Sequence, residues 1–175
     1  LNESVKRKKI SEGEKARLLE KVKTTSSIEK ISNSDLVIEA VFEDLKLKHN
    51  LYQRIEPHLK DGAILASNTS TLPITKLSEV LEDSTRFIGI HFFSPVDKMN
   101  LVELIKSEKT NDNALAIALD YTSLIKKTPI VVNDSRGFYA NRCIIPYINE
   151  GLRMLSEGIE PALIENSAKH IGMPV

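Results

Sequence analysis

The chain has 175 residues, of which 41% are hydrophobic and 27% are charged, a balance typical of globular proteins. Its 24 Lys and Arg residues offset its 24 Asp and Glu residues, so the composition gives no general attraction for nucleic acid or for an anionic membrane. The apolar stretches are short, such as 36–42, and we expect no transmembrane segment and no secretory signal. The single cysteine, Cys143, excludes an intrachain disulfide and fits a reducing compartment.

The two ends of the sequence favour a segment of a longer polypeptide. The chain begins with Leu1 rather than Met, and residues 171–175 contain no helix cap or closing element. A chain of this length has room for one domain, or for one domain and the beginning of a second. We therefore expect an internal segment that contains parts of two domains.

The first half of the chain predicts a helix and then a strand–helix–strand unit. Ser11 and Glu14 have the spacing of a capping box, and the apolar residues up to Val22 favour a helix behind it. The next elements are a β-branched strand, a helix with apolar residues at four-residue steps, and a second strand, at 36–42, 45–59 and 63–66. This order predicts parallel strands joined by a right-handed crossover.

The second half predicts the rest of an α/β sheet and then a purely helical part. Pro73 favours a helix over 74–81, because proline is tolerated near a helix start. The remaining elements are two strands that form a hairpin, a helix, a last strand and a long helix, at 86–93, 101–105, 112–126, 129–132 and 139–156. The break at 135–137 predicts one domain over 1–135 and the beginning of another over 136–175.

Ligands of α/β sheets bind beyond the carboxyl ends of the strands, so the polar residues that end the predicted strands are candidate site residues. Four groups meet this criterion: Glu43 with Asp44, the run 67–71, the run 91–94, and Asn133 with Asp134.

His91 ends one strand of the predicted hairpin, and Glu103 lies within the other. If the strands pair antiparallel about a turn centred near Asp97, the two residues face each other with Cβ atoms about 5 Å apart. The carboxylate would then fix which imidazole nitrogen is free, as a general base requires. Spacing alone leaves open a core histidine bonded to a backbone carbonyl and a solvent-facing Glu103.

Three further features have both a functional and a plain structural interpretation. The run Ser-Asn-Thr-Ser-Thr at 67–71 could hold a polar ligand or only cap the following helix. Asn141 could contact a ligand or simply begin the last helix. Glu43 and Lys48 flank the start of a helix and could form an ordinary surface pair.

The other reactive residue types give no site. Cys143 is expected to be a small core residue, because nothing adjacent would activate its thiol. His49, His58 and His170 have no ligand spacing to one another or to carboxylates, so we assign no metal. The basic cluster at 6–9 is expected to be a solvated helix face, with a contact to phosphates as the alternative.

Several of these segments, in this order and at these separations, resemble the 3-hydroxyacyl-CoA dehydrogenases. The resemblance covers nearly the whole chain and rests on DLVIEAVFED at 35–44, ASNTST at 66–71, HFFSPVDKM at 91–99, LVE at 101–103 and GFYANR at 137–142. The residues after His91 are most similar to the dehydrogenase part of multifunctional fatty-acid oxidation proteins. In those proteins an enoyl-CoA hydratase domain precedes the dehydrogenase.

The resemblance implies a fold, a cofactor and a reaction. The fold is α/β, an incomplete Rossmann-type NAD-binding sheet followed by the start of an all-helical C-terminal domain, which supplies dimer contacts in this family. The reaction is the NAD-dependent oxidation of (S)-3-hydroxyacyl-CoA to 3-oxoacyl-CoA in fatty-acid beta-oxidation. The implied assembly is a homodimer, with fusion to enoyl-CoA hydratase as an option, in the bacterial cytoplasm or in mitochondria.

Carried over position by position, the resemblance also implies roles for single residues. His91 matches the catalytic base and Glu103 the carboxylate that orients it. Ser70 matches a serine that approaches substrate and nicotinamide, and Asn141 an asparagine at the reacting end of the substrate. The positions that match cofactor contacts are Glu43, Lys48, Asn68, Ser70 and Ser94, the last standing where many single-function relatives have asparagine.

One departure from the family is large. The dinucleotide-binding fingerprint Gly-x-Gly-x-x-Gly is absent among the seven glycines, and in the family it precedes the position that Leu1 matches. We therefore expect the isolated segment to be inactive. The alternatives are an inactive binding or scaffold segment of a larger protein, and a related β-hydroxyacid dehydrogenase. The segment does not indicate a preference for acyl-chain length.

Overall fold

The computed structural model describes residues 1–173 and contains one five-stranded sheet. Its strands lie side by side in chain order: β1 (Leu36–Glu39), β2 (Ile64–Ser67), β3 (Phe87–Phe92), β4 (Leu101–Lys106) and β5 (Thr128–Asn133). The first three strands are parallel, β4 is antiparallel to β3, and β5 is parallel to β4. The predicted strand–helix–strand unit and hairpin are therefore confirmed.

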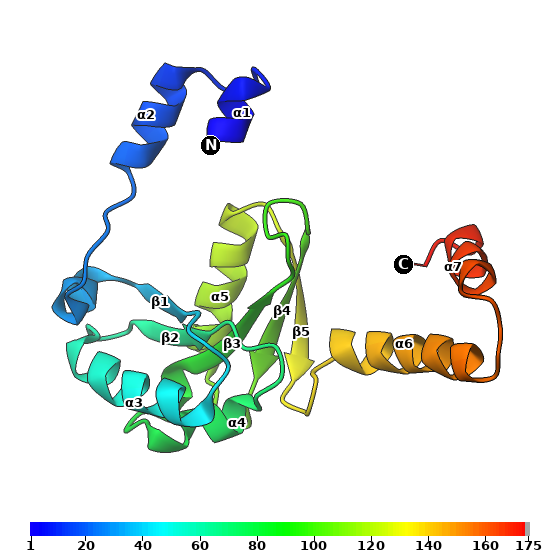
Figure 1. Ribbon diagram of the computed structural model, residues 1–175. Helices are drawn as coiled ribbons and strands as arrows, with labels where there is room; N and C mark the ends of the chain where they lie inside the picture. The colour runs from blue at the N-terminus through cyan, green and yellow to red at the C-terminus, as the bar shows by residue number, and fades with distance from the viewer. Residues whose placement is uncertain (174–175) are drawn as a thin grey trace.

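Helices cover both faces of the sheet (Figure 1). On one face lie α3 (Leu45–Ile55) and α4 (Ile74–Leu77), and on the other lies α5 (Asp112–Leu124). Short 3-10 helices occupy Ile28–Asn33, Glu56–His58, Ser78–Val80 and Ser84–Arg86. The predicted helix over 74–81 is thus divided into α4 and the 3-10 helix Ser78–Val80.

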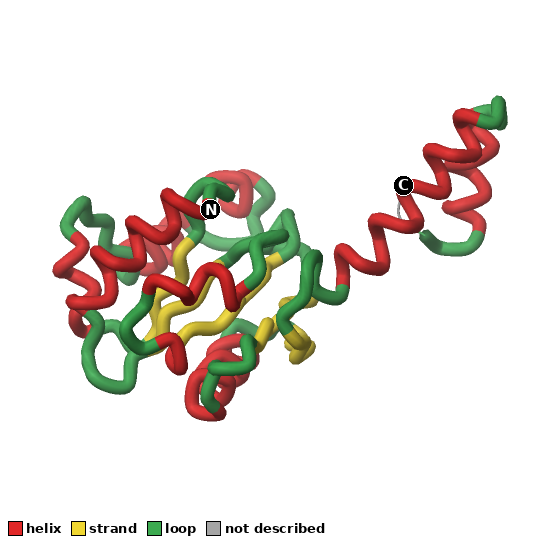
Figure 2. The backbone as a smooth tube through the Cα atoms, turned by 90° about the horizontal axis from the view of Figure 1, so that it is seen from below, coloured by secondary structure: helices red, strands yellow, loops and turns green. Residues whose placement is uncertain are grey.

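The remaining helices project away from the sheet (Figures 1 and 2). They are α1 (Asn2–Lys6), α2 (Glu12–Glu20), α6 (Ala140–Ser156) and α7 (Pro161–His170). The capping box predicted for α2 is confirmed, because the Ser11 hydroxyl accepts the Glu14 N–H and the Glu14 carboxylate accepts the Ser11 N–H. The sequence analysis did not predict α7.

Each strand alternates its side chains between the two faces, and this period of two determines where the polar residues lie. Leu65, Phe87 and Ile105 point towards α3 and α4 and form a buried core with residues of those helices. Moving along the strands in steps of two from these apolar positions reaches Ser67, His91 and Glu103. The same face therefore becomes polar at one edge of the sheet.

Gly89 allows α4 to approach this face closely. It pairs with Ile105 in the β3–β4 ladder. A Cβ atom at Gly89 would lie 2.7 Å from Ile74 Cδ1 and 2.9 Å from Ile105 Cβ, closer than carbon atoms can pack. The close approach of α4 holds the preceding run, 67–71, over the end of β2.

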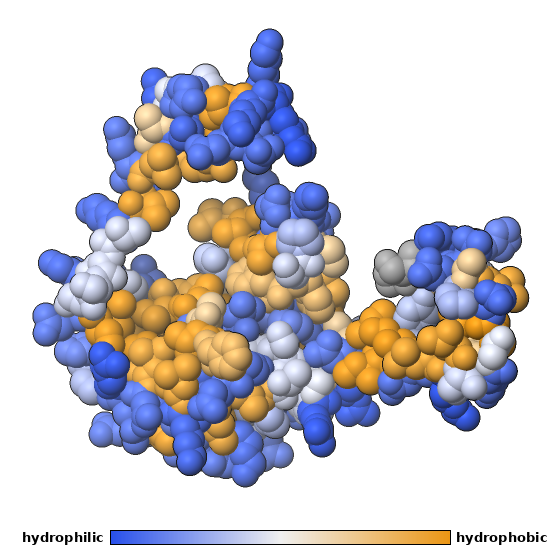
Figure 3. All heavy atoms as spheres, viewed as in Figure 1, coloured by the Kyte–Doolittle hydropathy of each residue, from blue (hydrophilic) through white to orange (hydrophobic). Residues whose placement is uncertain are grey.

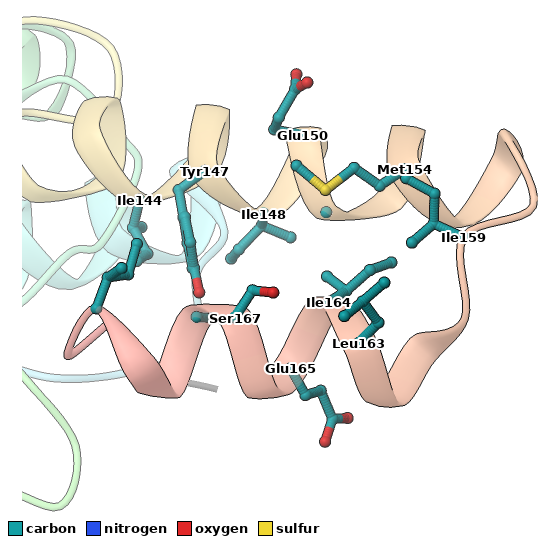
Figure 4. A pocket seen from close by; sticks show the side chains of 13 residues that line it. Ile144, Tyr147, Ile148, Glu150, Met154, Ile159, Leu163, Ile164, Glu165 and Ser167 are labelled. Carbon is teal, nitrogen blue, oxygen red and sulfur yellow. The ribbon is translucent and has the colours of Figure 1, made fainter.

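The arm formed by α6 and α7 is largely apolar. Figure 3 shows hydrophobic side chains along α6, and Ile145, Ile148 and Leu152 are each at least half exposed. Figure 4 shows the groove between α6 and α7, which is lined mainly by apolar side chains, with the carboxylates of Glu150 and Glu165 pointing away from it. No helix within residues 1–173 is both long and apolar enough to cross a membrane.

Cys143 corrects one expectation about this arm. It is exposed on α6, so the prediction of a small core residue is wrong. The physical reason is that α6 runs away from the sheet instead of packing on it (Figure 1).

Candidate active site

The polar edge of the sheet gathers most of the residues that end strands. Glu39, Ser67 and His91 lie at or near the carboxyl ends of β1, β2 and β3, and the antiparallel β4 places Glu103 beside His91. Asn133 and Asp134 do not belong to this edge. Because β5 runs opposite to β1, β2 and β3, its carboxyl end lies level with the amino end of β3, and the expectation that groups them with the other strand ends is wrong.

His91 and Glu103 form a buried pair, as the hairpin spacing predicts. They are partners in the β3–β4 ladder, with 2.8 Å between His91 Nδ1 and Glu103 Oε2. The exposed fraction is 5% for His91 and 0% for Glu103, so a solvent-facing Glu103 is ruled out. A carboxylate only accepts hydrogen bonds, so Nδ1 carries the proton and Nε2 is the free acceptor of the neutral ring. No residue within 1–173 bonds to Nε2.

The second oxygen of Glu103 holds the start of α6. Glu103 Oε1 accepts the N–H groups of Tyr139 at 2.9 Å and Ala140 at 2.8 Å. Burial opposes ionisation of this carboxyl, but the bonds from His91, Ala140 and Tyr139 outweigh it, and the pKa of Glu103 is lowered. One ionised carboxylate thus connects the histidine to the helix that follows the sheet.

The chain reaches this position through an unusual backbone. Gly137 has φ of 76° and Phe138 has φ of 51°, both in the left-handed region. The Phe138 side chain is buried in the core under α3 and α4, and its ring centroid lies 6.1 Å from that of His91. Phe138 therefore anchors the start of α6 next to the histidine.

Asn141, in the first turn of α6, reaches across to Ser70. Its Nδ2 donates to the Ser70 carbonyl oxygen at 2.8 Å, so Asn141 does more than begin a helix. The Ser70 N–H donates to Glu43 Oε1 at 3.0 Å. The backbone of Ser70 is therefore held on both sides. Its hydroxyl has no hydrogen-bond partner within residues 1–173 and lies on an exposed residue.

Glu43 organises the whole run 67–71. Its Oε1 also accepts from the Thr69 hydroxyl at 2.5 Å, the Thr71 N–H at 3.1 Å and the Thr71 hydroxyl at 3.2 Å. Partial burial works against its charged form, but the bonds from Thr69, Thr71 and Lys48 prevail, and the pKa of Glu43 is lowered. The loop is thus built around one anionic side chain.

The first turn of α4 is capped by a different residue. Asp134 Oδ1 accepts the N–H of Ile74 at 2.9 Å, and Oδ2 accepts the N–H of Thr75 at 2.8 Å. The run 67–71 does not cap this helix, so that alternative is wrong. The chain segment between β5 and α6 performs the capping from 60 residues away in sequence.

Lys48 and Glu39 form a second buried pair, which sequence reasoning missed. Both side chains are 0% exposed, and Lys48 Nζ lies 2.7 Å from Glu39 Oε1 and 3.3 Å from Glu43 Oε2. The interpretation of Glu43 and Lys48 as an ordinary surface pair is therefore wrong. The available signal was Glu39 itself, a charged residue inside an apolar run. Its carboxylate also accepts the Val41 N–H at 2.6 Å, which turns the chain and ends β1 at Glu39 rather than at 42.

Asn68 and Ser94 lie near the edge with different connections. Asn68 Oδ1 accepts the Phe92 N–H at 2.9 Å, while its Nδ2 group has no partner within residues 1–173. The Ser94 side chain is exposed and makes no hydrogen bond in the same range. The structure thus connects Asn141, Ser70, Glu43 and Lys48 in one network, pairs His91 with Glu103, and leaves Ser94 outside both.

A hollow of about 600 Å³ opens beside this network. Asn141 and Thr71 line it, together with Arg136, Gly137, Arg142, Ile145 and Pro146. Residues 1–173 contain no group of three His, Cys, Asp or Glu side chains that could hold a metal ion.

Taken together, the sheet and this edge define an α/β protein with a buried histidine–glutamate pair near the carboxyl ends of its first three strands. The family model described as the 3-hydroxyacyl-CoA dehydrogenase NAD binding domain matches residues 1–135, and the one described as the 3-hydroxyacyl-CoA dehydrogenase C-terminal domain matches 137–175. The chain belongs to the 3-hydroxyacyl-CoA dehydrogenase family. The Rossmann-type NAD-binding fold and the helical segment expected from the resemblance are confirmed.

The similar curated proteins are much longer than this chain. The fatty acid oxidation complex subunit alpha of Shewanella amazonensis is 40% identical over all 175 residues, which make up 25% of that protein. The same-named subunit of a Psychrobacter species is 38% identical, and the chain covers 24% of it. The chain thus spans about a quarter of the length of these relatives.

Solved structures give the same result. The (S)-3-hydroxybutyryl-CoA dehydrogenase PaaH1 of Ralstonia eutropha is 38% identical with a TM-score of 0.93, covering 99% of this chain and 62% of that protein. FadB2 of M. tuberculosis is 32% identical with a TM-score of 0.90, covering 98% and 61%. The dehydrogenase part of multifunctional enzyme 1 from C. elegans is 36% identical with a TM-score of 0.68, covering 75% and 30%.

Proposed function

We propose that this chain carries the catalytic residues of an NAD-dependent enzyme that oxidises (S)-3-hydroxyacyl-CoA to 3-oxoacyl-CoA, with His91 as the general base. One observation carries the proposal: the buried 2.8 Å contact between His91 and Glu103, which leaves Nε2 without a hydrogen-bond partner among residues 1–173. Membership of the dehydrogenase family supports it.

Each residue of the network has a defined task in this reaction. His91 Nε2 accepts the proton of the 3-hydroxyl group as the C3–H bond breaks, and Glu103 stabilises the imidazolium that results. NAD, when bound, accepts the hydride from C3. The Ser70 hydroxyl and the Asn141 amide orient the hydroxyl and the thioester, which is a positioning contribution. The hollow beside Asn141 is the place we assign to the part of the substrate that follows the thioester.

The residues present fit the nicotinamide end of the cofactor. Asn68 offers an unused amide N–H group and Ser70 an unused hydroxyl, and the Ser70 N–H donates to the ionised Glu43. We assign Lys48 to the cofactor through Glu43, because its ammonium group is fully buried. Ser94 is assigned as an exposed contact at the rim. The pyrophosphate would need a glycine-rich loop, which we place in a longer polypeptide.

We infer that this longer polypeptide is a multifunctional fatty-acid oxidation protein of a bacterial cytoplasm. The names of the curated relatives support this, as does their length. Within it, 1–135 would be the later part of the NAD-binding domain and 136–175 the beginning of a helical domain that forms homodimers. An enoyl-CoA hydratase domain would precede both. This polypeptide is called the parent below.

The test is NADH-dependent reduction of acetoacetyl-CoA, followed by absorbance at the NADH band. It compares this chain with a form extended upstream through the strands that carry the glycine-rich loop. We expect activity only in the extended form. Absence of activity in both, with circular dichroism showing intact folds, would favour the scaffold alternative. Equal turnover of free acetoacetate would instead favour the related β-hydroxyacid dehydrogenase.

A further inference from the structure

Three charged side chains, Glu39, Lys48 and Glu43, contact one another beside the candidate active site, and the reaction described above gives no task to Glu39. Glu39 and Lys48 have fully buried side chains, whereas Glu43 is 33% exposed. Lys48 Nζ stands between the two carboxylates, 2.7 Å from Glu39 and 3.3 Å from Glu43. Burying charges is costly unless they are paired, and here two carboxylates share one ammonium group.

Glu39 accepts hydrogen bonds from four donors. Oε1 accepts from the Val41 N–H at 2.6 Å and from Lys48 Nζ at 2.7 Å. Oε2 accepts from the Tyr52 hydroxyl at 2.6 Å and the Ser67 hydroxyl at 2.8 Å. Burial and the neighbouring carboxylate raise the pKa of Tyr52, so its phenol remains a donor. Donors on both oxygens stabilise the charged carboxylate.

The charges of these three side chains do not cancel. Lys48 contributes one positive charge, and Glu39 is its nearer and fully buried counterion. Glu39 and Glu43 thus share one lysine, so the three side chains together carry one net negative charge, and the lowered pKa of Glu43 keeps it ionised at neutral pH. Glu43 lies beside Ser70, whose N–H it accepts at 3.0 Å. Without Glu39, the same lysine would neutralise Glu43.

We propose that Glu39 is a positioning residue that sets the charge of this edge and thereby its preference between the two redox forms of the cofactor. By neutralising Lys48, it leaves a net negative charge beside the place assigned to the nicotinamide. The oxidised ring is cationic and the reduced ring is neutral, so this charge favours NAD⁺ over NADH. The inference rests on the proposed function.

The test uses the parent with the substitution Glu39→Gln, which keeps the size of the side chain and removes its charge. Fluorescence titration gives the Kd for NADH, and displacement of NADH gives the Kd for NAD⁺. We expect the ratio of the NAD⁺ Kd to the NADH Kd to rise roughly tenfold, the effect of one partly screened charge at short range. An unchanged ratio, with both constants shifted equally, would mean that Glu39 is only structural.

Matched variants separate charge from hydrogen bonding. Ser67→Ala removes one donor from Glu39 but keeps all three charges, so its ratio should stay within about twofold of wild type. The double variant Glu39→Gln with Lys48→Met removes both buried charges and leaves Glu43 negative. It should also keep the wild-type ratio. A tenfold rise in the double variant would overturn the proposal.

The comparison holds even if Glu39→Gln alone fails to fold, since an unpaired buried lysine is destabilising. Glu43→Gln then serves as the variant with no net charge, and its ratio should rise while the double variant stays unchanged. Failure of the wild-type parent to bind NADH would refute the proposed function itself. Normal NADH binding, with the same ratio of Kd values in every variant, would refute only the role of Glu39.

Discussion

Two carboxylates, Glu39 and Glu103, are buried on the same face and at the same edge of the sheet, but they pair with different kinds of basic group. Each lies within 2.8 Å of a basic group, and each accepts further hydrogen bonds. The partner of Glu39 is Lys48, whose ammonium group is enclosed between two acids. The partner of Glu103 is His91, whose second ring nitrogen remains unbonded within the described part of the chain.

The difference comes from the chemistry of the two bases. An imidazole has two nitrogen atoms on opposite sides of a ring, so a carboxylate can hold one while the other accepts a proton. An ammonium group has only donors at a single atom, and a buried one has no basic site left. We therefore expect substitutions at the His91 pair to reduce turnover, and substitutions at the Lys48 pair to act on cofactor binding and stability.

The largest effect is expected for His91→Ala in the parent. Loss of the general base should lower kcat for 3-hydroxybutyryl-CoA oxidation by about a thousandfold or more. The Kd for NADH should stay within about twofold, because no cofactor contact is assigned to the ring. Steady-state kinetics measure the loss of kcat, and fluorescence titration measures the Kd for NADH. Turnover within threefold of wild type would remove His91 from the base role.

Glu103→Gln should have the next largest effect. The amide keeps the size of the side chain but cannot stabilise the imidazolium, so kcat should fall by about a hundredfold. One amide atom also cannot accept hydrogen bonds, so the contacts to Tyr139 and Ala140 or the contact to His91 will be lost. A loss of only a few-fold, with the fold intact, would make Glu103 a structural residue.

The stability of the Glu103→Gln variant should depend on pH less strongly than that of the wild type. The pKa of Glu103 is lower in the folded protein than in the unfolded chain, so its contribution to stability is present above the unfolded pKa and is lost as pH falls through the folded pKa. The free energy of unfolding, measured with urea from pH 7 downwards, should therefore decline more steeply in the wild-type parent than in Glu103→Gln below about pH 4.5. Parallel curves would contradict the assigned ionisation.

Asn141→Ala tests the link between the two halves of the site. Without its amide the Ser70 carbonyl loses the 2.8 Å bond from α6, and both orienting groups are disturbed. We expect kcat/KM to fall by about ten- to a hundredfold, since small misplacements at a reacting centre have effects of this size. Cys143→Ala, on the same helix but outside the network, is the matched control and should keep wild-type kinetics.

The His91 pair could be predicted from sequence because both residues lie in one hairpin. An antiparallel register follows from equal distances to the turn, and the ladder has the expected pairing. The strands and most helices were predictable for a similar reason, since apolar spacing is a local signal. Residues whose partners are local along the chain can be placed without a structure.

The Lys48 pair could not be predicted, because its partners come from β1, β2 and α3. Nothing local shows that Lys48 turns inward or that Tyr52 and Ser67 converge on Glu39. The capping of α4 by Asp134 was missed for the same reason. So was the direction of β5, which runs opposite to β1, β2 and β3 and places Asp134 at the other end of the sheet. Polar networks between elements depend on tertiary packing that spacing does not record.

The smallest effect on turnover is expected for Tyr52→Phe, which removes a single donor from Glu39. The phenol is fully buried and bonds to Oε2 at 2.6 Å, so its loss should lower the free energy of unfolding by about 1–3 kcal/mol. Glu39 keeps its three other donors, and kcat should stay within about twofold. Urea unfolding and steady-state kinetics on the parent measure both. A tenfold loss of turnover at unchanged NADH affinity would mean that the Lys48 pair also acts in the chemical step, and the contrast with the His91 pair would not hold.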